Sequence, residues 1–299
     1  MPGFVICPRQ HRGADRCMLC APTPPHLAMT STLPVPAMDA ADHRDLAQAH
    51  ALLEHPGLAA KIANTVGAPI EDLLSKRLPK ALSSRIDAIS QRALRIALRS
   101  ALLTMRRQAP GTARPRLHGV AVAATGAAGG FFGLPGLLVE LPLTTTLMLR
   151  SIADIARAEG ERLDDPATTL ACLEVLAHGG RSARDDGSES GYFAVRTAMA
   201  QQLSAAAQYI AAHGIGSKGA PALVSLMSRI AAKFSITVSE KLAAQAVPLV
   251  GAASGALLNT VFIAHFQAMA RGHFIVRRLE RRYGEAAVRQ AYEALPASA

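Results

Sequence analysis

The chain has 299 residues, a net charge of +10 and an apolar fraction of 50%, yet only 4% of its residues are aromatic and it has no tryptophan. Its length allows one or two domains with an ample core, and its abundant alanine and leucine favour an all-α protein. Its four cysteines do not suggest a disulfide framework. Although basic, the chain lacks an aromatic platform or a recognised module, so nucleic-acid binding is not expected.

Residues 1–45 form a proline-rich leader that we expect to be disordered. No apolar secretory segment lies in it, and either Met29 or Met38 is a plausible true start. Cys7, His11 and the pair Cys17/Cys20 resemble part of a zinc site, but a structural zinc site needs a second hook in a folded surround. We therefore expect no metal, and a helical domain over 46–296.

Helical periodicity begins after the leader, with two short helices on either side of Pro56-Gly57. Residues 80–107 follow as an amphipathic helix whose apolar stripe includes Ile86, Ala93 and Ile96. Four arginines recur every seven residues beside that stripe, which suits either contact with anionic lipid or a solvated edge: Arg85, Arg92, Arg99 and Arg106.

Two long apolar stretches, 117–149 and 242–270, share a glycine-rich core. Residues 122–130 align without gaps on 247–255, and such small residues let helix backbones approach closely. We expect two glycine-rich helical hairpins, packed on each other or inserted in lipid. Their contact candidates are Gly126, Gly129, Gly130, Gly133, Pro135, Gly136, Pro248, Gly251 and Gly255.

Polar residues inside these stretches are costly against lipid and are expected to be buried. They are Glu140, Asn259, His265 and His273. If the two hairpins pack together, we expect these four side chains to meet between them. There they would either carry out proton chemistry or form interhelical hydrogen bonds that fix how the helices align along each other.

Between the two stretches we expect helices that begin at Asp165-Pro166, over 192–212, and from Pro221 towards Phe234. A basic terminal helix follows the second stretch and breaks at Gly284. It adds Arg277 and Arg278 to the lipid-contact candidates.

No catalytic centre is predicted. The sequence has no His-Glu-x-x-His or Gly-x-Ser-x-Gly motif and no cysteine with a convincing histidine partner. The loop 214–219 lacks the order of a phosphate-binding P-loop. No cofactor is expected.

Four strings of residues resemble the EcsC protein family of bacteria over His50 to Leu295. They are 129–142, 173–180, 192–196 and 238–251, the last continuing through Asn259, His265 and His273 to Glu280. The family is linked to an ABC transporter operon and secretion, and its biochemical activity is not established, although some members carry a protease label.

The resemblance implies an accessory protein associated with a membrane. Because catalytic motifs and a secretory segment are missing, we expect that it is not an enzyme and that it lies in the cytoplasm or on the cytoplasmic face of the inner membrane. Its expected partner is the membrane surface or a membrane transporter. The alternatives are a soluble helical protein that binds an apolar ligand, and a hydrolase without a recognisable motif.

Overall fold

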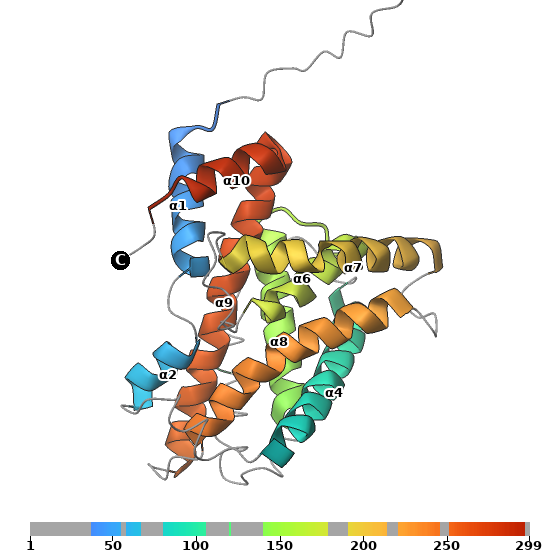
Figure 1. The fold of residues 1–299 in the computed structure, drawn as a ribbon, viewed down its shortest axis with the longest axis vertical. Helices are drawn as coiled ribbons and strands as arrows, with labels where there is room; N and C mark the ends of the chain where they lie inside the picture. The colour runs from blue at the N-terminus through green and yellow to red at the C-terminus, as the bar shows by residue number, and fades with distance from the viewer. Residues whose placement is uncertain are drawn as a thin grey trace, which may run out of the picture. The chain divides into compact units, whose positions relative to one another are not determined.

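The computed structural model describes residues 37–54, 58–66, 80–105, 120, 140–178, 191–213, 221–245 and 251–296. Throughout these ranges the regular elements are helical and no strand occurs, which confirms the all-α class (Figure 1). The glycine-rich core over 122–136 and Pro248 lie outside the described residues, as do most of the expected leader and Arg106.

In chain order, the described helices are α1 (Ala40–Glu54), α2 (Leu58–Val66), α4 (Lys80–Met105), a helix over 140–158, α6 (Pro166–Glu174) continued by the 3-10 turn η1 (Val175–Ala177), α7 (Gly191–His213), α8 (Pro221–Gln245), α9 (Gly251–Tyr283) and α10 (Glu285–Glu293). α1 begins at Ala40, inside the stretch assigned to the leader, because its first turn carries Asp42, which is buried against α9.

Local signals set several helix ends as expected. Asp165 caps α6, where its carboxylate accepts a hydrogen bond from the Ala167 backbone N–H at 2.8 Å, and Pro166 occupies the first turn. Gly284 separates α9 from α10 with φ at +85°, a conformation that side chains rarely tolerate.

The second apolar stretch is divided between two helices, which the sequence did not predict. α8 continues past Phe234 to Gln245, and α9 runs unbroken from Gly251 through Arg271 to Tyr283. The expected terminal basic helix is therefore the last part of α9. Gly251 and Gly255 lie in the first two turns of α9, where Gly255 is buried.

α9 is the central helix of the fold, since α1, α2, α8 and α10 all pack against it (Figure 1). Its apolar face carries Phe262 and Phe266, which pack with Phe234 of α8 at ring-centroid distances of 6.2 and 5.8 Å. The side toward α1 carries Gly272, where an added Cβ would lie 2.6 Å from Leu53 Cγ. The glycine thus lets the two helices approach closely.

α4 packs on α8 through a face slightly rotated from the predicted one. Ile86 and Ala93 are buried as expected, but Leu94 and Ala97 complete the buried stripe while Ile96 is 40% exposed. Because α8 is the neighbour that covers α4, the contact with α8, rather than the apolar periodicity alone, sets which side is buried. Arg85, Arg92 and Arg99 are exposed.

Candidate functional site

A cluster of buried polar side chains lies where α6, α7 and α9 meet. Tyr192 Oη and His273 Nδ1 share a hydrogen bond of 3.0 Å. Glu174 Oε1 lies 3.7 Å from His178 Nε2, and Glu174 Oε2 lies 3.9 Å from His273 Nε2. These last two distances are too long for hydrogen bonds. Glu174 Oε1 and both Nε2 atoms are therefore buried without a hydrogen-bond partner.

The surroundings keep His273 in this cluster from carrying a positive charge. Burial, together with His178, Arg196 and Arg277, lowers the pKa of His273 well below its usual 6.5, so its ring is neutral at pH 7. Burial also raises the pKa of the Tyr192 phenol, which stays protonated. The Glu174 carboxyl group thus lies beside a neutral His273 ring on its buried side.

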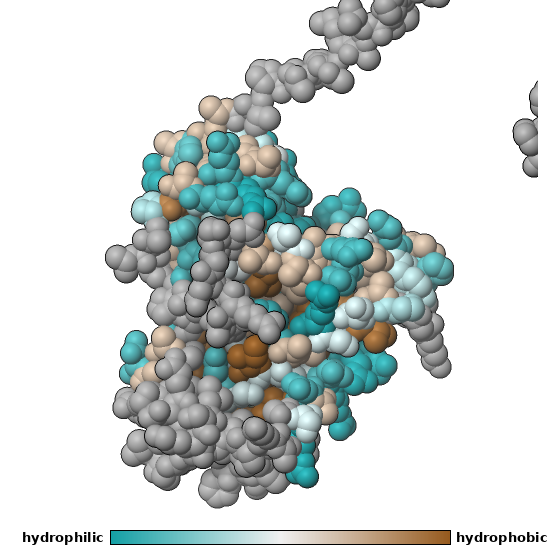
Figure 2. Space-filling view, viewed as in Figure 1, coloured by the Kyte–Doolittle hydropathy of each residue, from teal (hydrophilic) through white to brown (hydrophobic). Residues whose placement is uncertain are grey.

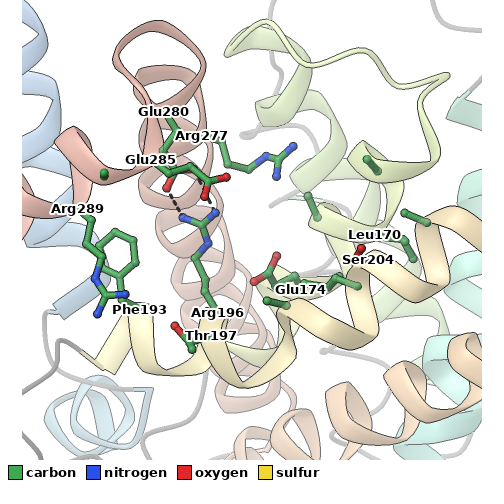
Figure 3. Close-up of a pocket in the computed structure, with 16 residues that line it drawn as sticks. Leu170, Glu174, Phe193, Arg196, Thr197, Ser204, Arg277, Glu280, Glu285 and Arg289 are labelled. Atoms are coloured by element: carbon green, nitrogen blue, oxygen red, sulfur yellow. Dashed lines mark hydrogen bonds and ion pairs between the residues drawn. The ribbon is translucent and has the colours of Figure 1, made fainter. Parts of the chain in front are cut away.

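A pocket of about 630 Å³ opens beside Glu174 between α6, α7, α9 and α10. Figure 3 shows Arg196 crossing it, with its guanidinium directed at Glu280. This pair is bidentate, with Nη1–Oε1 at 2.6 Å and Nη2–Oε2 at 3.1 Å. The wall between the charged groups is apolar and includes Leu170 and Leu203.

Most charges around the pocket are already paired. Arg277 Nε donates to Glu161 Oε1 at 2.9 Å, and Arg289 Nε donates to Glu293 Oε1 at 2.7 Å. Arg277 is therefore anchored to a carboxylate from a distant part of the chain, and Arg289 to one a single turn away on α10. Glu174 is not hydrogen-bonded to any of them, and Oε1, as noted, has no hydrogen-bond partner at all.

A second surface of interest is formed by α4, α7 and α8, with α8 packed against both of the others. These three helices hold nine lysines and arginines but only two acidic residues, Asp87 and Glu240. Glu240 is buried. Lys241 is buried against Glu140 and Arg196 is paired with Glu280, so the positive charge available at the surface comes from the other cations, which lie on α4 and α8. Figure 2 shows apolar and hydrophilic residues interspersed over this part of the molecule.

Large apolar side chains are exposed on the same helices. Val224 and Ile236 on α8 are 63% and 37% exposed, and Ile96 on α4 is exposed as well. Among the described residues, Pro221–Ala244 is the one stretch whose length and composition suffice to cross a membrane, and 44% of its most apolar window is buried. Core helices of soluble proteins share that property.

The four polar residues singled out in the sequence are all buried but do not form one cluster. Glu140 Oε1 accepts from Lys241 Nζ at 2.6 Å in an ion pair with neither side chain exposed by more than 3%. His265 Nδ1 lies 3.4 Å from Lys61 Nζ, and Asn259 is fully buried on α9. Only His273 belongs to the cluster around Glu174.

The arginines at the end of α9 have carboxylate partners. Arg277 pairs with Glu161, as described. Arg278 pairs with Asp42 and Asp45 of α1 and with Glu159. A role for these two arginines in lipid contact stays a prediction, but part of their charge is already neutralised within the protein.

Sequence reasoning missed Glu174, His178 and Arg196 as site residues. A signal was present, because Glu174 and His178 stand four residues apart in an otherwise apolar helix and so share one face. Cys172, the one cysteine in the described ranges, is fully buried and burial raises the pKa of its thiol, so it is not an activated nucleophile.

Every member of the polar cluster comes from the family-like strings of the sequence, namely 173–180, 192–196 and the end of the string that starts at residue 238. A model of the EcsC protein family matches residues 42–279. The chain belongs to the EcsC protein family. Neither a curated protein nor a solved structure matches it. The EcsC domain thus runs from α1 to α9, and parts of three of its four family strings meet at the polar cluster.

Proposed function

We propose that this EcsC protein is a membrane-associated accessory protein without catalysis of its own, which docks on anionic lipid through α4, α7 and α8. The observation that carries the proposal is the concentration of positive charge on these helices, beside exposed Val224, Ile236 and Ile96. Cations with apolar side chains between them are the composition of surfaces that bind anionic membranes.

The site of action proposed is the cytoplasmic face of the inner membrane, next to a transporter. This part rests on the family's link with a transporter operon. Two glycine-rich hairpins, around Gly126–Gly136 and Pro248–Gly255, are proposed to supply the close helix contacts or the inserted segment. Burial of Gly255 near the start of α9 supports a packing role for the second of them.

A non-enzymatic role is supported by the side chains that sequence reasoning considered for chemistry. Glu140 is occupied by Lys241, and His265 lies beside Lys61. Cys172 is buried with a raised pKa. These groups serve packing and internal charge pairing.

Vesicle sedimentation tests the lipid contact. The protein should bind vesicles that contain phosphatidylglycerol, bind phosphatidylcholine alone weakly, and lose binding as salt rises. Each cation near an anionic membrane contributes about 1 kcal/mol. Arg92→Glu/Arg99→Glu on α4 should therefore lower partitioning about 30-fold or more.

Arg44→Glu/Arg271→Glu is the matched control, because both arginines are exposed on α1 and α9 rather than on the basic helices. Equal loss of binding in both double variants would refute the assignment of the surface. Carbonate washing of cell membranes adds the location: release from the membrane fits peripheral docking, whereas retention indicates insertion.

A further inference from the structure

The pocket beside Glu174 is lined by more carboxylates than its arginines hold in ion pairs at close range. Each cationic lining residue has a carboxylate partner: Arg196 pairs with Glu280, Arg277 with Glu161 and Arg289 with Glu293. Two lining carboxylates are left over. They are Glu174 at the buried end and Glu285 in the first turn of α10, which is exposed.

Glu174 is a buried acidic residue and not a surface one. Its side chain is 4% exposed, it lines the pocket, and its Oε1 has no hydrogen-bond partner. His178 Nε2 and His273 Nε2 face it, each also without a partner. A buried carboxylate oxygen left without a donor is unfavourable, so a group that donates a hydrogen bond to it stabilises the site.

We propose that this pocket binds a small aliphatic amine, whose ammonium group donates to Glu174 and whose methylene chain lies along the apolar wall. An ammonium carries three donors and a positive charge, which match a carboxylate with spare acceptor capacity. Leu170 and Leu203 offer apolar contact between the two free carboxylates. A second ammonium group, as in a diamine, would reach the Glu285 end.

The opposite ligand, an anion, is disfavoured by the same pairing. Arg196 is held by both oxygens of Glu280, and Arg277 by Glu161, so an incoming phosphate would have to displace these carboxylates. Figure 3 shows the Glu174 carboxylate close to Arg196 but outside the dashed contacts that join Arg196 to Glu280.

Calorimetric titration of the full chain with 1,4-diaminobutane and spermidine tests the proposal, with 1,4-butanediol as the neutral analogue and inorganic phosphate as the anion. The amines should bind and the diol and phosphate should not. Glu174→Gln keeps the side-chain size but removes the charge, and should weaken amine binding at least ten-fold. Glu285→Gln should weaken diamine binding by a smaller factor.

Asp87→Asn is the matched control, an exposed acid on α4 away from the pocket, and should leave amine affinity unchanged. Ala200→Phe fills the pocket from α7 while Glu174 stays in place, and should also abolish binding. Absence of amine binding, preference for phosphate, or full affinity in Glu174→Gln would overturn the proposal. Glu174 and Glu285 lie on α6 and α10, outside the proposed lipid surface, so vesicle binding should be the same in Glu174→Gln and Glu285→Gln as in the wild type.

Discussion

The buried ion pair between Glu140 and Lys241 gives the largest stability effect that we expect from one side chain. The Nζ–Oε1 distance is 2.6 Å, Lys241 is 0% exposed and Glu140 3%. Lys241 Nζ also lies 5.2 Å from the centre of the Phe262 ring. Desolvation lowers the pKa of Lys241 and the Glu140 charge opposes that shift, so the charge on Lys241 depends on Glu140.

Lys241→Met removes one charge and leaves Glu140 buried without its partner. Breaking such a pair costs about 3–5 kcal/mol, and for a domain of this size each kcal/mol lowers Tm by about 2–4 °C. Glu140→Leu/Lys241→Met removes both charges and should recover most of the loss, because a buried pair can be replaced by apolar side chains at little cost.

Thermal and urea unfolding of both variants measure these effects. Lys233→Met is the control, since it makes the same substitution two turns earlier on α8 at a partly exposed position. If Lys241→Met is no more destabilising than Lys233→Met, or if the double variant is worse than the single one, the reasoning fails.

Two further predictions concern stability. Gly272→Ala should destabilise the protein by about 1–3 kcal/mol despite the better helix propensity of alanine, because the new Cβ would lie 2.6 Å from Leu53 Cγ and 3.1 Å from the Ala49 carbonyl oxygen. Urea unfolding should show that Leu53→Ala relieves part of this loss in the double variant. Additive effects of the two substitutions would contradict the proposed clash. Burial raises the pKa of Glu240 to about 7, so the folded state holds a proton that the unfolded state releases near pH 4.5. The free energy of unfolding should therefore fall as the pH rises from about 4.5 to about 7. Glu240→Gln should be more stable than the wild type by about 1–3 kcal/mol at pH 8 but not at pH 4.5. An equal difference at both pH values would show that Glu240 does not titrate in this way.

Features with a local cause could be predicted from the sequence. Asp165-Pro166 begins a helix because a side chain two residues away satisfies a backbone N–H, and Gly284 ends one because only glycine accepts its φ readily. The all-α class follows from composition in the same way. Such signals depend on residues that are close together in the chain, so they can be recognised in the sequence itself.

Features caused by distant residues could not be predicted. Glu140 pairs with a lysine 101 positions away, and no spacing rule indicates that. Gly272 has no repeat around it, whereas the repeated glycines drew attention to Gly130 and Gly255. The polar cluster likewise joins residues from α6, α7 and α9, so its members look unrelated until the helices are packed.

The contacts between α1 and α9 affect how the chain folds during its synthesis on the ribosome. Asp42 meets Arg278, Arg282 and Tyr283 across 236 to 241 positions of sequence. Ribosomes add about 5–20 residues per second, so α1 waits on the order of ten seconds or more for its partner helix. During that time the apolar face of α1 is exposed and accessible to chaperones. In a chain whose synthesis stalls before Arg278, α1 stays unpaired, so its exposed apolar face distinguishes the incomplete chain from the finished one.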